Sequence, residues 1–154
     1  MNSSVVAGLL KRVYKNFDML SFENRLKLQK FLYLMKAYKL DIGYDFSLYS
    51  HGPYSTELAK DGFQIKNFNE IKSVEFVDAE AEDRFKRFID FINPHKDDPE
   101  WLEIATSLHL FKSLYTSETE DQLVKRVKEK NEKFSSKETR IREIFQELRT
   151  AGFI

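Results

Sequence analysis

Residues 24–54 read NRLKLQKFLYLMKAYKLDIGYDFSLYSHGPY, and this stretch decides the fold. Its first half predicts a helix over Arg25–Tyr38. At about 100° of rotation per residue, apolar side chains fill one broad arc of that helix and also occupy the opposite side. A helix that is apolar on two sides lies inside a protein and not on its surface. We therefore expect Arg25–Tyr38 to form the central helix of the fold.

The expected central helix carries several basic side chains and no acidic residue over its length. Lys27 and Lys30 occupy one gap between its apolar arcs, and the other gap holds Arg25, Lys36 and Lys39. Long basic side chains bury their aliphatic stems while the charged ends reach water. We therefore expect two basic seams that extend outward and take their partners from other parts of the chain.

A short strand and a second helix are expected to follow. Asp41–Gly43 supplies a turn, since glycine tolerates positive φ, and Phe46–Tyr49 reads as a strand with imperfect alternation. His51–Pro53 breaks that strand, because proline lacks the N–H that a ladder needs. The next helix begins near Tyr54 or Ser55, and Ser55 is a good N-cap for it.

The strings LQKFLYLMKAY and YDFSLYSHGPYSTEL resemble the signature of the YwgA-like proteins, a family of uncharacterised prokaryotic proteins. That signature is a Leu-Gln-Lys helix with an aromatic residue, then an aromatic strand that runs into Gly-Pro-Tyr-Ser and a helix. It falls here on Leu28, Gln29, Lys30, Tyr33, Phe46, Tyr49, Gly52, Pro53, Tyr54, Ser55 and Leu58. The close likeness covers roughly residues 24–60.

The same segment is more distantly similar to the SocA-like or Panacea antitoxin domain, which shares a Leu-Gln-Lys helix and a Gly-Pro turn. These resemblances imply a mostly helical, winged-helix-like domain. The YwgA-like family implies no particular chemistry, and the antitoxin relatives imply protein partners. Together they imply a regulatory, antitoxin-like binding module.

Length and composition fit one folded domain over residues 1–154. The chain has 154 residues, 42% of them hydrophobic, which suffices for a sizeable core and exceeds the content of a disordered chain. The absence of cysteine excludes disulfides and Cys-ligated zinc sites. The only candidate internal boundary is Asn93–Pro99, which we interpret as a loop within one domain.

The sequence indicates a cytoplasmic location. Its first residues lack the cationic and small-residue pattern of a signal peptide. No stretch approaches the roughly 18 apolar residues that cross a bilayer. We therefore expect a cytoplasmic protein without a membrane partner.

The net charge is zero, but the charges are unevenly distributed. Residues 1–40 contain eight basic and two acidic groups, whereas residues 75–103 contain four basic and ten acidic groups. One interpretation, which we prefer, is that the two regions pack together and offset each other. The other is that the basic region meets an acidic partner or nucleic acid.

The rest of the chain predicts further helices and one more strand. Apolar spacing indicates helices over Ser4–Phe17 and Ala79–Ile92. Asp98–Pro99 opens another helix, because aspartate caps helices and proline suits their first turn. Between them, Ser73–Val77 alternates well enough to be an edge strand that pairs with Phe46–Tyr49 in a small sheet or wing.

Two capping-box spacings predict the last helices. Ser117 with Glu120 and Ser135 with Glu138 each precede an apolar run, and Gly152 is a C-terminal stop. The result is about seven helices and a small sheet. The expected fold class is mainly α with a small β element, in which a winged-helix-like core is extended by C-terminal helices.

No residue set indicates catalysis, a cofactor or a metal. His95, Asp97 and Asp98 lie close in the sequence, but a solvated turn explains them better than a metal site. Ser50 and His51 are adjacent, which does not orient a nucleophile toward a base. We therefore expect a non-enzymatic protein, in which His51 is the histidine most relevant to function.

Protein binding is the function that the sequence favours. A neutral, aromatic-rich helical domain can offer Tyr and Phe side chains to a partner protein, whose identity the sequence does not give. The expected partner-binding residues surround the strand and the turn: Tyr49, His51, Tyr54, Ser55 and Leu58. For the tyrosines the alternative is core or rim packing. The lysine-rich final helices could form a homodimer interface or a solvated face.

Duplex DNA binding by a transcriptional regulator is the alternative function. In a winged-helix fold, the helix Tyr54–Phe63 would be the recognition helix. Glu57 and Asp61 oppose this role, because their charges cancel nearby lysines and repel phosphate. The expected contacts to DNA are Lys27, Lys30, Tyr54, Ser55, Thr56, Lys60 and Gln64.

Overall fold

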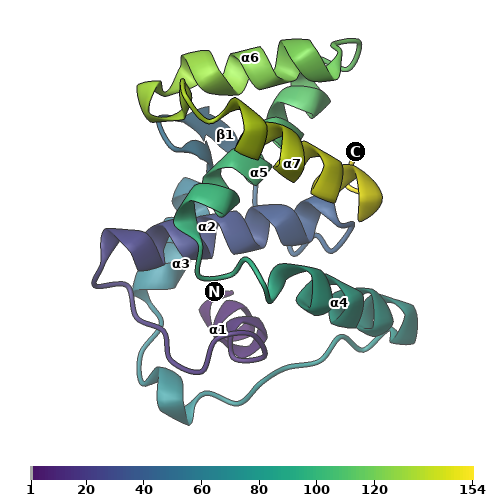
Figure 1. The fold of residues 1–154 in the computed structure, drawn as a ribbon. Coiled ribbons are helices and arrows are strands. Elements are labelled where there is room, and N and C mark those ends of the chain that lie inside the picture. Colours follow the sequence, from purple (N-terminus) through teal and green to yellow (C-terminus); the bar gives the residue numbers. More distant parts are fainter. Residues whose placement is uncertain (1) are drawn as a thin grey trace.

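The computed structural model describes residues 2–154, which form a mainly helical fold (Figure 1). These residues contain seven α-helices, two short 3₁₀ helices and a two-stranded sheet, and no helix among them is long and apolar enough to cross a membrane. The predicted class, mainly α with a small β element, is confirmed. In chain order the elements are α1 (Ser3–Leu10), α2 (Phe22–Ala37), β1 (Ser47–Tyr49), β2 (Gly52–Tyr54), α3 (Thr56–Phe63), η1 (Phe68–Glu70), α4 (Ala79–Ile92), α5 (Pro99–Leu114), α6 (Glu120–Lys130), η2 (Glu132–Phe134) and α7 (Glu138–Thr150).

The helix α2 is the central helix, as predicted. Figure 1 shows it running across the middle of the molecule, with α1 and α4 on one side and α6 and α7 on the other. Every residue from Leu26 to Met35 is buried. The Phe31 ring lies 6.2 Å from the Tyr14 ring and 5.4 Å from the Phe88 ring of α4. Burial on all faces explains why apolar side chains occur around the whole helix.

Two helix bounds differ from the prediction. The first helix ends at Leu10 and not at Phe17, because the chain turns there and the Tyr14 N–H donates to the Leu10 carbonyl at 2.7 Å. Tyr14 and Phe17 are nevertheless buried. Their apolar spacing therefore reflects burial in the segment after α1 and not a continuing helix. The central helix begins earlier than expected, at Phe22, because the Ser21 side chain caps it.

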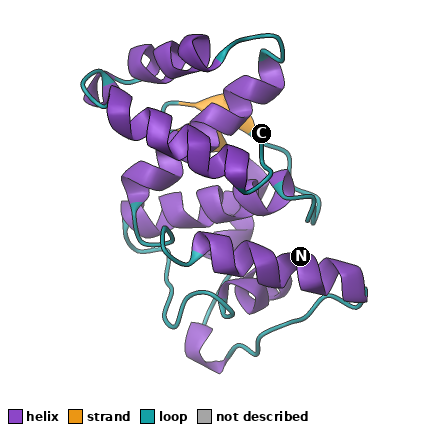
Figure 2. Cartoon of the chain, turned by 45° about the vertical axis from the view of Figure 1, so that its right-hand side comes forward, coloured by secondary structure: helices purple, strands orange, loops and turns teal. Residues whose placement is uncertain are grey.

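The small sheet is a β-hairpin of β1 and β2, in which Leu48 lies opposite Pro53 (Figure 2). The prediction that the Gly-Pro turn ends the β structure was wrong. A two-stranded sheet has only edge strands, where proline is tolerated. The predicted strand Ser73–Val77 was also wrong, because that segment is irregular and its Val74 N–H donates to the Gly8 carbonyl of α1 at 3.2 Å.

The C-terminal helices follow the sequence signals in part. The bounds of α4 are those predicted, and Asp98 caps α5 as expected. The capping box of α6 is formed by Thr119 with Gln122 and not by the predicted pair, Ser117 with Glu120. Both pairs have the required spacing, so the spacing alone did not identify the box. The box predicted before α7 is absent, since the residue before that helix makes no side-chain cap. Gly152, with φ of 89°, follows the end of α7 as predicted.

The basic and acidic regions of the chain contact each other. Arg12 donates to Glu82 Oε1 at 2.7 Å, and Lys27 Nζ lies 3.0 Å from Asp97 Oδ1. The hydrogen bond from Arg12 holds the pKa of Glu82 below its usual range. These contacts support the interpretation that the two charged regions offset each other within the molecule.

Candidate functional site

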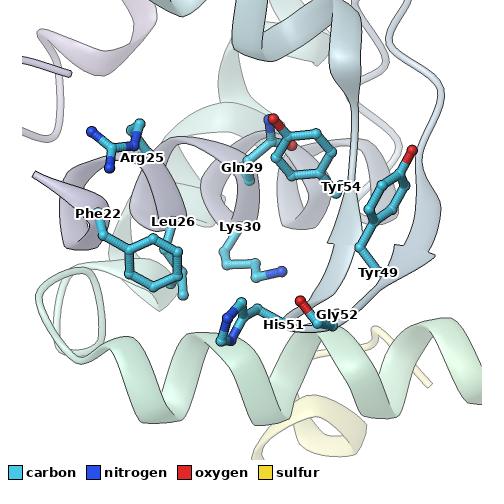
Figure 3. Close-up of a pocket in the computed structure, with 10 residues that line it drawn as sticks. Phe22, Arg25, Leu26, Gln29, Lys30, Tyr49, His51, Gly52 and Tyr54 are labelled. Carbon is cyan, nitrogen blue, oxygen red and sulfur yellow. The ribbon is translucent and has the colours of Figure 1, made fainter.

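A pocket of about 240 Å³ lies between α2 and the β-hairpin (Figure 3). Phe22 and Lys30 of α2 line one side, and Tyr49, His51 and Tyr54 of the hairpin line the other. The Phe22 and His51 rings are 5.0 Å apart, and so are the rings of Tyr49 and Tyr54. Aromatic walls with a few polar groups are typical of ligand and peptide sites.

Lys30 lies at the base of this pocket. Its exposed fraction is 2%, and its Nζ donates to the Pro53 carbonyl of β2 at 2.9 Å. Burial lowers the pKa of Lys30 to about 7; the carboxylate of Glu103 opposes this shift, and the charges of Lys130 and Lys133 add to it. The amine is therefore partly neutral near pH 7.

Glu103 of α5 is a buried carboxylate beside the same pocket, with an exposed fraction of 1%. Its Oε1 accepts a hydrogen bond from Lys133 at 2.8 Å and lies 3.6 Å from His51 Nδ1. Within residues 2–154, Glu103 Oε2, His51 Nδ1 and the buried Ser107 Oγ have no hydrogen-bond partner. Such groups are rare in protein interiors and often mark functional positions.

Gln29 and Lys30 together hold the hairpin against α2. The Gln29 side chain donates to the Ser55 carbonyl at 2.9 Å and accepts the Ser55 N–H at 2.8 Å. The Ser55 Oγ in turn accepts the N–H of Leu58 at 3.2 Å and caps α3. Side chains of the Leu-Gln-Lys segment thus hold the backbone of the Gly-Pro-Tyr-Ser segment by hydrogen bonds. Two adjacent polar residues in a helix that is otherwise largely apolar are the signal that could have predicted these contacts.

Position 52 requires glycine for two reasons, its backbone conformation and the closeness of neighbouring side chains. Its φ is 97°, and a Cβ at this position would lie 3.0 Å from Ser107 Oγ and 3.1 Å from Lys30 Nζ. The tight contact fixes how closely the hairpin approaches the buried amine.

Substitution of Gly52 by alanine should destabilise the fold more than the same change at Gly43. Gly43 has φ of 102° but open space around it, so Gly43→Ala carries only the backbone penalty of about 1–2 kcal/mol. Gly52→Ala adds the contact with Lys30 and Ser107. Urea unfolding of both variants measures the difference, and equal losses would contradict the close packing described here.

The predicted partner-binding residues divide into two groups. Tyr49, with an exposed fraction of 50%, and the half-buried His51 and Tyr54 line the pocket and can meet a ligand. Ser55 and Leu58 are buried, with exposed fractions of 2% and 0%. Ser55 caps α3 and Leu58 lies in the core, so neither side chain is presented to a partner on this surface.

The predicted DNA-binding residues are also divided. Lys27 and Lys30 are buried, and neither forms the outward basic seam that the sequence predicted. Their polar ends are used inside the molecule, by Asp97 for the first and by the β2 backbone for the second. Tyr54 is half-buried and Ser55 buried, whereas Thr56 and Lys60 of α3 and Gln64, the residue after it, are exposed.

His95, Asp97 and Asp98 each contact a different partner, and half-buried His95 stacks on Trp101 with a ring distance of 3.8 Å. Residues 2–154 contain no group of three or more His, Cys, Asp or Glu side chains that could hold a metal ion. His95 Nε2 lies 3.0 Å from Glu147 Oε2, and Asp98 pairs with Arg140 at 2.6 Å. Asp98 therefore forms an ion pair and caps α5, whereas burial lowers the pKa of His95, which contacts Glu147.

Comparisons of this chain with models of protein families, with curated proteins and with solved structures found no match.

Proposed function

We propose that this protein is a non-enzymatic binding module that recognises a partner protein through the surface around the pocket of α2 and the β-hairpin. The observation that carries the proposal is a pair of exposed aromatic side chains that line this pocket. Phe22 and Tyr49 have exposed fractions of 55% and 50%. Large exposed apolar side chains beside a pocket are typical of protein interaction sites.

The size of the pocket suits one side chain of a partner. Its volume of about 240 Å³ is below the range of about 300–1,000 Å³ that holds drug-sized molecules. Aromatic rims around a pocket that accepts a single anchor side chain are common in protein interfaces. We therefore propose that the partner inserts an aromatic or aliphatic side chain between Phe22 and Tyr49.

The charged groups around the base of the pocket indicate which kind of group the partner carries next to its inserted side chain. Two lysines beside the pocket, Lys130 and Lys133, act on a single buried carboxylate, that of Glu103. Lys130 also donates to the Ser50 carbonyl in the hairpin turn at 2.7 Å. An acidic group beside the inserted side chain of the partner would complement this surplus of positive charge.

The regulatory part of the proposal follows from the sequence resemblance. The likeness of residues 24–60 to the YwgA-like family and to the antitoxin domain stays a prediction, as does the cytoplasmic location. A protein that acts through contacts, without a cofactor, is consistent with an antitoxin-like role. A homodimer through the final helices also stays a prediction; their cations already pair within the chain, as in Lys128 with Glu138 at 2.7 Å.

Truncation of the rim residues should weaken partner binding without unfolding the protein. We expect Tyr49→Ala and Phe22→Ala each to lower the affinity by about tenfold or more, as for typical interface hot spots. Phe63→Ala is the matched control, because Phe63 is a similarly exposed phenylalanine outside this pocket. A photo-crosslinker at position 49 would identify the partner, and calorimetry with the purified partner would measure the affinities. Equal binding by all three variants would reject the proposed surface.

Duplex DNA binding by α3 is the second proposal. It is favoured by the exposure of Thr56 and Lys60 on α3 and of Gln64 directly after it, and a winged-helix role for that helix stays a prediction. It is opposed by Glu57, which lies 3.4 Å from Lys60 Nζ. A mobility shift at low salt that weakens with Lys60→Glu would support it, and the lack of a shift would reject it.

A further inference from the structure

We propose that Lys30 is a nucleophilic amine that binds a small aromatic aldehyde or ketone in the pocket of α2 and the β-hairpin by forming an imine. This inference concerns a low-molecular-weight ligand and goes beyond the binding of a partner protein. It rests on the position of the amine, on the groups around it and on the character of the pocket walls.

The position of Lys30 suits a nucleophile. Figure 3 shows its side chain extending from α2 into the space between Phe22, His51 and Tyr49. In the described part of the chain Lys30 forms no salt bridge, and its Nζ donates to a neutral acceptor, the Pro53 carbonyl. An amine that donates one N–H to a carbonyl keeps its lone pair for attack on a ligand. Burial is a known means of keeping such lysines neutral.

The surrounding polar groups suit the proton transfers of imine formation. His51 Nδ1 and Ser107 Oγ have no hydrogen-bond partner within residues 2–154. Ser107 Oγ and Lys30 Nζ lie 3.0 Å and 3.1 Å from one point, the position that a Gly52 Cβ would occupy. His51 also lines the pocket, where its ring can reach a bound ligand.

The reaction balances without a further reactant. The Nζ lone pair forms a bond to the carbonyl carbon, the π electrons of the carbonyl move to its oxygen, and one proton passes from nitrogen to that oxygen. The resulting hydroxyl is protonated, with protonated His51 as the donor, and leaves as water while the nitrogen lone pair forms the C=N bond. Loss of the second amine proton returns the proton to His51. The products are one imine and one water.

The walls of the pocket determine the class of carbonyl compound. Phe22, Tyr49 and Tyr54 present aromatic surface, and Leu26 adds an aliphatic side chain. Flat aromatic ligands pack well against such rings. The pocket volume of about 240 Å³ admits a single ring with its carbonyl group and excludes larger conjugated ligands.

Reductive trapping of the full-length chain tests this inference. The protein is incubated with benzaldehyde and sodium cyanoborohydride at pH 7, and the benzylated lysines are identified by peptide mapping. We expect Lys30 to be modified at least about tenfold faster than the exposed Lys60, because the amine of a lysine in water is almost fully protonated at this pH. Benzyl alcohol, which fits the pocket but cannot react, should slow modification of Lys30 and leave Lys60 unaffected.

Two variants complete the test. Lys30→Met should abolish the fast modification, and Lys27→Met should retain it, although Lys27 is also a buried lysine of α2. The mapping on the unmodified sequence gives the answer even if Lys30→Met folds poorly. Modification spread over surface lysines without preference for Lys30, or fast modification that benzyl alcohol does not slow, would overturn the inference.

Discussion

Replacement of Phe31 by alanine is expected to lower the free energy of unfolding by about 3–5 kcal/mol, the usual loss for a buried phenylalanine. Phe31 has an exposed fraction of 0% and lies at the centre of α2. Its ring contacts Tyr14, which precedes α2, and Phe88 of α4, so the cavity would open where three parts of the chain meet. Because these three parts pack against one another, none of them can move into the cavity by itself. Relaxation of the structure should therefore recover little of the lost stability.

The matched control for this change is Phe63→Ala. Phe63 has an exposed fraction of 57%, so its truncation should cost less than about 1 kcal/mol. Urea unfolding of both variants, followed by circular dichroism, measures the two losses. A loss for Phe31→Ala as small as that of the control would show that α2 does not lie in the core.

The second large effect is a pH dependence of stability that originates at Lys30. Its folded-state pKa of about 7 is below the value of about 10.4 for lysine in an unfolded chain. Between these values the unfolded chain binds more protons, so the wild-type protein gains stability as the pH rises. Lys30→Met removes this titration. The free energy of unfolding of the variant, relative to that of the wild type, should therefore be most favourable below pH 7.

The expected size of this effect is large. Between pH 6 and pH 9 the stability of Lys30→Met relative to the wild type should fall by about 2–3 kcal/mol. A constant loss of about 1–3 kcal/mol adds at all pH values, because the Pro53 carbonyl loses its donor. The groups that surround Lys30 are Glu103 of α5, His51 of the hairpin turn, Lys130 of α6 and Lys133 of η2.

Urea unfolding at several pH values measures this difference. Lys60→Met controls for the loss of one positive charge, because Lys60 is exposed on α3. Glu103→Gln offers a second check, since the Glu103 carboxylate raises the pKa of Lys30 and its removal should lower that pKa further. A stability difference for Lys30→Met that does not change with pH would contradict the burial of a titrating amine.

Much of the helical framework could be predicted from the sequence. The central position of α2 followed from apolar residues on two sides of one helix, and the bounds of α4 followed from regular apolar spacing between Asp78 and Asn93. The N-caps Ser55 and Asp98 were also predicted, because short polar side chains before an apolar run are strong local signals. These features depend on residues close together in the chain.

The features that could not be predicted depend on contacts between distant residues. The β-hairpin forms because Gln29 and Lys30 hold the backbone of Pro53 and Ser55, more than twenty positions along the chain. The irregular conformation of Ser73–Val77 also depends on a distant contact, a backbone hydrogen bond with α1. Local alternation carries no information about either contact.

The candidate site was predicted in part. Tyr49, His51 and Tyr54 were identified because they flank a conspicuous Gly-Pro turn, and the structure places them on the pocket. Glu103 and Ser107 were missed, although both are polar residues in a run of α5 that is mostly apolar and buried. Lys30 was interpreted as a surface cation, because a sequence does not show whether a lysine end reaches water.

The central claim is that the enclosed helix α2 holds Lys30 as a buried amine at the base of the pocket. An NMR titration of the chain with ¹³C,¹⁵N-labelled lysine tests it most directly. One lysine side-chain signal, absent from Lys30→Met, should titrate with a midpoint near pH 7. If every lysine signal instead titrated near the value of about 10.4 for lysine in water, the claim would be wrong.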